Sequence, residues 1–241
     1  MELVNVVCLY WGNKYKTEYV NILYNMTQRH LTIPHKFIIY TEHVKMPKIV
    51  KGDNVEVRKL PFYDYSGWWN KLTLFSPKAN LEGDCLYFDL DVVITENIDC
   101  FFTYEEDSKV VLMRDFNLST EGFNSSIMRF NNKVMTPKVW DLYQSEKKRF
   151  DRLQGDQNVI SECIKQTPED YKIYPDEWTF SAKWYDRYNP RFGRSRWTFE
   201  QYPGAKVAVF HGKPDPLQLV DVHPHESYDP KKIEWVKNHW K

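Results

Sequence analysis

The sequence predicts one α/β domain in which a mixed, mostly parallel sheet is flanked by helices. Residues Leu3–Tyr10 form a near-continuous apolar run, as expected for a strand that is buried on both faces of a sheet. From Thr17 to His30, apolar side chains recur at helical spacing, so a helix is expected to pack on that sheet. Strand and helix patterns go on alternating over the first hundred residues, which is typical of βαβ units.

The remaining elements follow from the same patterns and from the positions of proline. Further strands are expected at His35–Thr41, Val55–Leu60, Cys85–Ile94, Val110–Met113, Ser126–Phe130 and Lys206–His211. Further helices are expected at Gly67–Phe75, Pro137–Phe150, Asp156–Gln166 and Asp229–Trp240. No repeat, low-complexity segment or linker interrupts the 241 residues, so a single domain over residues 1–241 is expected.

Charge balance and cysteine usage exclude several classes of protein. Lysine plus arginine and aspartate plus glutamate both number 33, whereas a general nucleic-acid binder usually shows a basic excess. The four cysteines are scattered without zinc-ligand spacing, so reduced thiols are expected. The N-terminus is typical of a strand and not of a signal peptide, and no apolar run approaches the ~20 residues that span a bilayer. A soluble, cytoplasmic protein without a transmembrane segment is therefore expected.

An acidic pair interrupts the apolar strand predicted at Cys85–Ile94. Asp89 and Asp91 alternate along that strand and would lie about 7 Å apart on one face. Burying two carboxylates without partners is costly, so either a cation neutralises them or they lie at the open end of the sheet, where α/β proteins bind ligands. Carboxylate oxygens suit Mg²⁺ or Mn²⁺, whose open positions substrate phosphates can fill. The alternative is that the pair caps loop amides or forms ion pairs with Arg114.

Six ordered segments place the acidic pair in a wider context. They are Leu9-Tyr10-Trp11-Gly12, Trp68-Trp69-Asn70-Lys71-Leu72, Asp89-Leu90-Asp91, Phe123-Asn124-Ser125-Ser126-Ile127-Met128, Gly155-Asp156-Gln157 and Phe210-His211-Gly212-Lys213-Pro214. With these segments in this order, nearly the whole chain resembles the GT-A glycosyltransferases. It is most similar to the family-eight group, which includes glycogenin and bacterial lipopolysaccharide hexosyltransferases, and to small bacterial and viral proteins related to that group. The resemblance implies a GT-A (Rossmann-like) fold, with a nucleotide-binding half at residues 1–115 and a donor-sugar and acceptor half at residues 116–241.

The resemblance also implies an activity and a metal site. The activity is metal-dependent transfer of a hexose-type sugar from a nucleoside diphosphate sugar, with UDP favoured, to a hydroxyl group of a glycan or another acceptor. The family places a histidine beside the acidic pair, so the expected ligands of Mn²⁺, or of Mg²⁺, are Asp89, Asp91 and His211. A neutral imidazole can ligate Mn²⁺, and Gly212 would let the backbone approach a phosphate closely.

Donor contacts are implied at several further positions. Aromatic stacking and close backbone approach after the first strand would hold the base, and polar groups beside apolar neighbours would hold the sugar hydroxyls. The residues expected to contact the donor are Tyr10, Trp11, Gly12, Tyr40, Thr41, Lys71, Asp89, Asn124, Ser125, Gly212 and Lys213. Alternatives stay open at four of them. Tyr10 could instead belong to the core, and Gly12 could simply form a turn. Lys71 could pair with an acid, and Lys213 follows His211 more closely than in the family.

Catalysis is expected to depend on Asp156, Gln157 and Asp91. By the resemblance, Asp156 lies against the transferred sugar, where its carboxylate would stabilise an oxocarbenium-like transition state, and Gln157 lies near the reacting carbon. The alternative for Asp156 is a helix N-cap. The resemblance favours retention at the anomeric carbon, which requires no dedicated base. An inverting enzyme would need a carboxylate aimed at the acceptor, such as Asp115 or Asp176.

Two other functions are also compatible with the sequence. A sugar-nucleotide nucleotidyltransferase would use a similar sheet, but Gly12-Asn13-Lys14 is neither a Walker-type loop nor a G-x-G-x-x-G sequence. A non-catalytic carbohydrate-binding relative would show an eroded metal site, whereas both acids and the histidine are present. For an active transferase, an acceptor site is expected among the late aromatic residues Trp178, Trp184, Tyr185 and Trp197.

Overall fold

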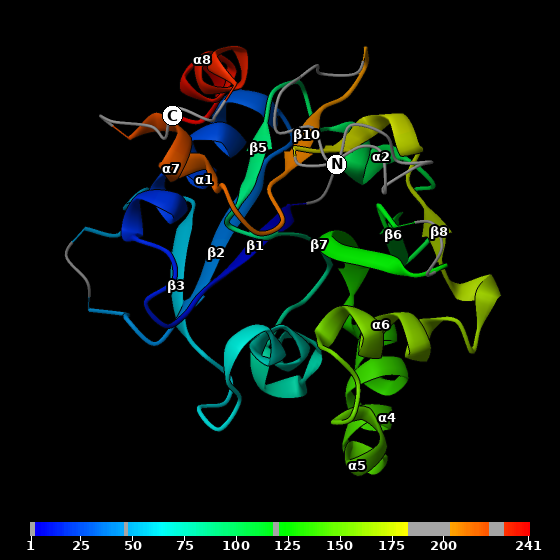
Figure 1. Cartoon of the computed structure of the whole chain (residues 1–241). Coiled ribbons are helices and arrows are strands. Elements are labelled where there is room, and N and C mark those ends of the chain that lie inside the picture. The colour runs from blue at the N-terminus through cyan, green and yellow to red at the C-terminus, as the bar shows by residue number, and fades with distance from the viewer. Residues whose placement is uncertain (1–2, 46–47, 118–120, 183–202, 222–228) are drawn as a thin grey trace.

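A computed structural model describes residues 3–45, 48–117, 121–182, 203–221 and 229–241 of the chain. Among these residues, the strands of the main sheet are β1 Val4–Tyr10, β2 His35–Thr41, β3 Val55–Lys59, β4 Asp84–Phe88, β6 Val110–Arg114, β7 Phe123–Asn131 and β8 Lys172–Ile173. They lie in the order β3-β2-β1-β4-β7-β6-β8 (Figure 1). Neighbouring strands pair in parallel except at β7, which is antiparallel to both β4 and β6. The predicted mixed, mostly parallel sheet is confirmed.

A second, smaller sheet joins segments that are far apart in the sequence. It is formed by β5 (Val92–Ile94), β9 (Thr179–Ser181) and β10 (Val207–Val209), in the order β5-β10-β9. β10 pairs antiparallel with β5 and parallel with β9. This pairing brings the chain that follows the acidic pair beside the segment that leads to His211.

Helices cover both faces of the main sheet (Figure 1). The described helices are α1 Thr17–His30, α2 Cys100–Thr103, α3 Asn132–Met135, α4 Leu142–Ser145, α5 Lys147–Phe150, α6 Asp156–Ile164, α7 Pro216–Val220 and α8 Pro230–His239, with the π-helix η4 (Thr136–Asp141) and the 3-10 helices η1 (Gly67–Phe75), η2 (Pro77–Ala79), η5 (Pro168–Asp170) and η6 (Asp176–Trp178). α1, α7 and α8 contribute to one apolar layer, and η1, α4 and α6 to the other. Within the described part of the chain, no helix is long and apolar enough to cross a membrane.

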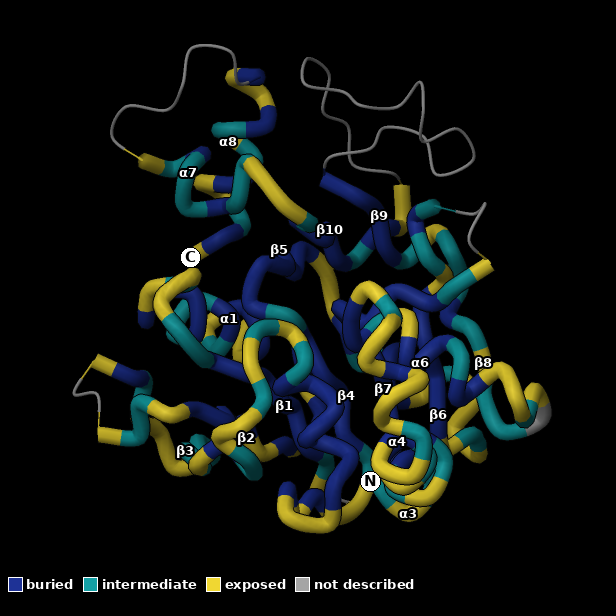
Figure 2. The backbone as a smooth tube through the Cα atoms, turned by 60° about the horizontal axis from the view of Figure 1, so that its bottom comes forward, coloured by how far each residue is buried: buried dark blue, intermediate teal, exposed yellow. Residues whose placement is uncertain are grey.

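Strand β1 lies at the centre of the core. Its alternate residues face different apolar layers, with Val6 and Cys8 in one layer and Val7 and Leu9 in the other. Figure 2 shows β1 and β4 as buried segments surrounded by more exposed chain. β1 and β2 pair in parallel along their whole length, so their carboxyl ends meet at one edge of the sheet. The strand is therefore buried on both faces, as its apolar run predicts.

The strand predicted at Cys85–Ile94 is in fact two strands in different sheets. β4 ends immediately before Asp89, whose N–H still donates to the carbonyl of Ser126 at 2.9 Å. The chain then turns at residues 90–91 before β5 begins. The apolar pattern hides this break, because the residues of β5 are as buried as those of β4 but pair with β10. The prediction that Asp89 and Asp91 alternate along one strand is wrong, since both lie on the β4–β5 connection.

The helix predicted at Pro137–Phe150 begins earlier and is not continuous. The side chain of Asn131 caps α3 by accepting a hydrogen bond from the N–H of Lys133, so the helical region starts directly after β7. Pro137 lies in η4, a π-helical turn, and its missing N–H interrupts the α-helical hydrogen-bond pattern there. The region then continues through α4 and α5.

Other differences concern short elements and strand ends. The strand predicted at Ser126–Phe130 is β7, which begins earlier, at Phe123. A register shift between Leu112 and Met113 of β6 lets the early part of β7 pair as well. The elements α2, α7, β8 and β9 were not predicted, because each has five residues or fewer and shows no clear periodicity.

Candidate active site

A cavity of about 340 Å³ opens at the carboxyl ends of β1 and β4. This is the edge at which open α/β sheets bind ligands. The lining residues are Leu9, Trp11, Lys14, Tyr15, Trp68, Lys71, Tyr87, Asp89, Leu90, Asp91, Asn124, Ser125, Ser126, Asp156, Gln157, His211 and Gly212. They come from the ends of β1 and β4, the β1–α1 loop, η1, the β4–β5 connection, the start of β7, the start of α6 and the segment after β10. Most of the side chains singled out in the sequence therefore meet in one place.

The two acids of the β4–β5 connection have different surroundings. Asp89 is partly exposed and accepts a hydrogen bond from the Tyr87 hydroxyl at 2.7 Å. Asp91 is only 8% exposed and accepts a hydrogen bond from the Tyr15 hydroxyl at 2.6 Å. Although the pair does not lie on a strand, both carboxylates face the same cavity.

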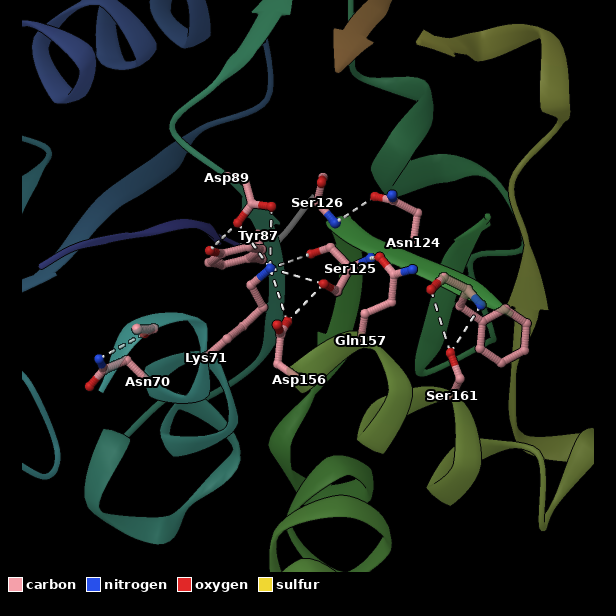
Figure 3. Close-up of polar contacts among 12 residues, drawn as sticks. Asn70, Lys71, Tyr87, Asp89, Asn124, Ser125, Ser126, Asp156, Gln157 and Ser161 are labelled. Atoms are coloured by element: carbon pink, nitrogen blue, oxygen red, sulfur yellow. Dashed lines mark hydrogen bonds and ion pairs between the residues drawn. The ribbon is translucent and has the colours of Figure 1, made fainter. Parts of the chain in front are cut away.

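Lys71 links one of these acids to a third carboxylate (Figure 3). Its Nζ atom lies 2.9 Å from an oxygen of Asp89 and 3.2 Å from an oxygen of Asp156. It also donates to the hydroxyl and the carbonyl of Ser125, at 3.0 and 3.1 Å. Burial lowers the pKa of Lys71, but the charges of Asp156 and Asp89 outweigh burial and leave that pKa above its ordinary value. The structure thus pairs this lysine, in its charged form, with acids.

The start of α6 fixes two polar side chains against β7. The carboxylate of Asp156 accepts a hydrogen bond from the Ser125 hydroxyl at 2.8 Å. The N-cap of α6 is Gly155, so the alternative that Asp156 is the N-cap is wrong. Gln157 accepts a hydrogen bond from the N–H of Ser125 at 3.3 Å and donates to the carboxylate of Asp115 at 3.0 Å. Asp156 and Gln157 are therefore both bonded to Ser125 of β7 (Figure 3), and Gln157 is bonded in turn to Asp115.

His211 lines the cavity from the segment after β10. Its Nε2 atom lies 2.6 Å from the Ser181 hydroxyl, and its ring stacks on that of Phe116 with centroids 5.5 Å apart. The N–H of Phe210 donates to the carbonyl of Asp91 at 3.0 Å, which holds this segment against the β4–β5 connection. Within the described residues, no three His, Cys, Asp or Glu side chains lie close enough together to hold a metal ion. The predicted ligands thus share one cavity without converging on a common point.

Asp91 is poorly accommodated as an anion. Burial raises its pKa, and the charge of Asp89 raises it further, to about 6. The hydrogen bond from Tyr15 and the charges of Lys14 and Lys71 act in the opposite direction but do not cancel the increase. The described lining contains three carboxylates and two ammonium groups, so with a neutral histidine its formal charge is negative.

Several predicted site residues lie outside the described lining. They are Tyr10, Gly12, Tyr40, Thr41 and Lys213 among the donor contacts, and Asp115 and Asp176 among the candidate bases. Tyr40 is buried, and its hydroxyl donates to the carbonyl of Ala79 and accepts a hydrogen bond from Arg58 at 3.0 Å. Asp176 pairs with Arg114 at 3.4 Å, so this arginine is not a partner of the acidic pair.

The aromatic residues predicted for an acceptor site have other surroundings. Trp178 packs against Phe101, Tyr104 and Tyr174, with ring centroids 5.3–5.9 Å apart, and it does not line the cavity. It is therefore a partly buried residue that packs against the apolar core. Trp184, Tyr185 and Trp197 lie outside the described residues.

Several lining residues were not predicted as site residues, among them Lys14, Tyr15 and Trp68. Lys14 and Tyr15 lie in the loop after β1. Their position is the one sequence feature that indicates a role in the site, because loops at the carboxyl edge of such a sheet line the ligand site. Trp68 begins η1 and is 57% exposed. A Cβ atom on Gly155 would lie 2.7 Å from the Trp68 indole nitrogen, so the absence of a side chain at Gly155 lets this indole lie over the start of α6.

Comparison with known proteins identifies the fold. No protein-family model matches the sequence, and no curated protein matches it significantly. Among solved structures, the glycosyltransferase GlyE of Streptococcus pneumoniae TIGR4 superposes with a TM-score of 0.64, at 17% identity over 88% of this chain. The galactosyltransferase LgtC, solved in complex with donor and acceptor sugar analogs, gives 0.63 at 12% identity over 98% of this chain. The bifunctional glycosyltransferase WbbM gives 0.64 at 14% identity over 98% of this chain.

These likenesses establish that the chain has the GT-A glycosyltransferase fold. The match covers 96% of LgtC but only 55% of GlyE and 50% of WbbM, so this chain spans about half the length of the latter two proteins. All three neighbours share this fold with the present chain at low sequence identity. The fold that the six sequence segments imply is thereby confirmed.

Proposed function

We propose that this protein transfers a hexose-type sugar from a nucleoside diphosphate sugar, with UDP as the nucleotide, to a hydroxyl group of a glycan or another acceptor. The observation that carries the proposal is the cavity at the carboxyl edge of a GT-A sheet, into which Asp89, Asp91, Asp156 and His211 all project. The similarity to LgtC, which was solved with donor and acceptor sugar analogs, supports the same reading.

We also propose that Asp89, Asp91 and His211 hold Mn²⁺, or Mg²⁺, when the donor is bound. The donor set is carboxylate oxygens and an imidazole, which suits these ions. The negative formal charge of the described lining would repel a diphosphate, and a divalent cation would reverse that charge. A cation would also favour the ionised form of the buried Asp91, whose pKa is about 6 without one. When bound, the cation would supply Lewis-acid stabilisation to the departing diphosphate.

The remaining polar residues would position the sugar. Asp156 is held by Lys71 and by the Ser125 hydroxyl, so its carboxylate is fixed before the substrate binds. A fixed carboxylate at the cavity wall would stabilise positive charge that develops at the anomeric carbon. Asn124 lies beside Ser125 in the lining and would bind sugar hydroxyls, with Gln157 near the reacting carbon.

Retention at the anomeric carbon is the proposed outcome. The carboxylate of Asp115 accepts one hydrogen bond from Gln157 at 3.0 Å and another from the N–H of Asn117 at 3.1 Å. Both oxygens of this carboxylate are therefore already engaged in hydrogen bonds. Asp176 is engaged with Arg114. These contacts do not favour either acid as the base that an inverting reaction requires.

A donor panel with and without metal tests the proposed function. The protein should release a nucleoside diphosphate from one nucleotide sugar when Mn²⁺ is present, and EDTA should abolish the release. Asp91→Asn should reduce this rate by a factor on the order of 100 or more, whereas Asp53→Asn, at an exposed aspartate away from the cavity, should leave it unchanged. Failure to bind or hydrolyse any nucleotide sugar, or turnover of nucleoside triphosphates instead, would reject the proposal.

A further inference from the structure

Two lysines line the cavity, and their ammonium groups have different surroundings. The ammonium group of Lys71 is buried and is directed to Asp89, Asp156 and Ser125. Because an ammonium group has three N–H donors, these contacts leave Lys71 none for a phosphate. Lys14 is exposed, and it forms no ion pair with an acid within the described part of the chain. Of the two lysines, Lys14 is therefore the one whose ammonium group is available to bind an anionic ligand.

The loop that carries Lys14 is fixed on both sides. Gly12 adopts a φ of +60°, a turn conformation that favours glycine, and its N–H donates to the Glu42 carboxylate at 2.9 Å. On the other side, the Tyr15 hydroxyl donates to Asp91 at 2.6 Å. Between these anchors, the Nζ atom of Lys14 lies 4.4 Å from the centroid of the Tyr15 ring, a cation–π contact. Lys14 is thus held on the cavity wall that leads to Asp91.

We infer that Lys14 binds the diphosphate of the nucleotide donor through its ammonium group, an inference that rests on the proposed function. A compact ammonium charge on a flexible side chain suits phosphate oxygens. The other lysine expected at the diphosphate, Lys213, is not part of the described lining, although His211 and Gly212 are. The positive side chain at the diphosphate therefore comes from the loop after the first strand, and not from the segment after β10.

The charges of the cavity explain why this lysine matters for phosphate. Lys71 is already neutralised by two acids, so Lys14 supplies the positive side-chain charge that remains available in the described lining. Removing it should weaken ligands in proportion to their phosphate charge. It should not change the contacts of an uncharged nucleoside, because these do not involve the ammonium group.

Binding of UDP and of uridine separates these effects. Affinities are measured in the presence of Mn²⁺ for the wild-type protein, Lys14→Met, Lys14→Arg and Lys16→Met, by calorimetry for UDP and by ligand-observed NMR for uridine. Lys14→Met should weaken UDP binding roughly tenfold and leave uridine binding unchanged, while Lys14→Arg keeps most of the UDP affinity. Lys16 is the matched control, because it is an exposed lysine in the same loop that does not line the cavity.

The outcomes distinguish this inference from the proposed function. Equal UDP affinity in Lys14→Met and wild type would overturn the inference and leave the donor assignment intact. An equal loss for UDP and uridine would also overturn it, because the substitution would then act through the shape of the loop. If the wild-type protein binds neither UDP nor uridine, the UDP assignment fails and the inference fails with it.

Discussion

The Tyr15 hydroxyl donates to a carboxylate oxygen of Asp91 at 2.6 Å and joins the β1–α1 loop to the β4–β5 connection. Burial raises the pKa of Tyr15 far above its ordinary value, and the negative charge of Asp91 raises it further. The tyrosine therefore keeps its proton and acts as the donor in this hydrogen bond. It is a stabilising partner for the ionised form of an acid that burial and Asp89 otherwise disfavour.

Tyr15→Phe should weaken Mn²⁺ binding in a pH-dependent way. The hydrogen bond from Tyr15 lowers the pKa of Asp91, so its loss should move that pKa above about 6. Protons would then compete with the metal at higher pH. If the pKa of Asp91 rises by about one unit, Mn²⁺ affinity should fall by up to roughly tenfold at pH 6 relative to wild type, and by little at pH 8.

Electron paramagnetic resonance of free Mn²⁺ measures the affinity. Tyr24→Phe is the control, since the Tyr24 hydroxyl bonds only to Asn54 among the described residues. Equal losses at both pH values would contradict the expectation.

Asp91→Asn should stabilise the metal-free protein at neutral pH although it removes a proposed ligand. The pKa of this acid rises from 3.8 to about 6 on folding, so the folded state favours the protonated form. Stability is therefore lost as the pH rises through the window between those values, and an asparagine does not suffer this loss. The variant should be more stable than wild type by about 1–3 kcal/mol at pH 7.5, with the difference shrinking towards pH 4.

Urea unfolding in EDTA at both pH values measures this difference. Added Mn²⁺ should then raise the melting temperature of the wild-type protein but not that of Asp91→Asn. A variant that is less stable than wild type at pH 7.5 in EDTA would show that Asp91 is satisfied without a cation.

Much of the fold can be predicted from local patterns. α1 and β2 have the predicted bounds, because their periodicity and the prolines and loops that flank them are properties of short windows. The break at Asp89 cannot be found in this way. It is fixed by the hydrogen bonds of that connection to Ser126 and Phe210, which are remote in sequence. Local hydrophobicity is the same on both sides of the break.

In the candidate site, too, some features can be predicted from the sequence and others depend on contacts between remote segments. The residue types around the acidic pair indicate the chemistry, and the fold places most of them in one cavity. The partners of the Lys71 ammonium group depend on the packing of η1 against β7. The sequence alone left two kinds of partner open for it, an acid or a phosphate. The contribution of Tyr15 was missed because a tyrosine in a loop carries no motif. Its contact with Asp91 depends on how two loops meet.

Lys71→Met should destabilise the protein strongly, and a second substitution should restore part of the loss. Lys71 and Asp156 are both buried, so removing the ammonium group leaves a carboxylate without its counter-charge. Breaking one side of a buried pair costs about 3–5 kcal/mol. In Lys71→Met with Asp156→Asn, the uncompensated charge is gone, and about 1–2 kcal/mol should return.

Urea unfolding of the two single variants and the double variant gives the coupling between these residues. Lys51→Met, at an exposed lysine without a described ion pair, is the control and should change stability by less than about 0.5 kcal/mol. Strict additivity of the two single substitutions would show that the ion pair contributes nothing to folding.

Arg129→Met should also destabilise the protein, for a reason unrelated to the cavity. Arg129 lies on β7 with 1% exposure, and its guanidinium group donates to the carbonyls of Phe101 at 3.2 Å, Glu105 at 2.6 Å and Ser108 at 3.1 Å, and to that of Phe102. Methionine would fill much of the space but leave these carbonyls without donors. A loss of about 3–5 kcal/mol is expected. Arg129→Lys should keep only part of this stability, because three donors on one nitrogen cannot reproduce the fork of a guanidinium group.

Differential scanning calorimetry measures the loss of stability, with Lys109→Met as an exposed control. Since β7 also carries Asn124 and Ser125, UDP affinity measured well below the melting temperature should stay near the wild-type value if the role of Arg129 is purely structural. A variant as stable as wild type would mean that water replaces the guanidinium group at these carbonyls.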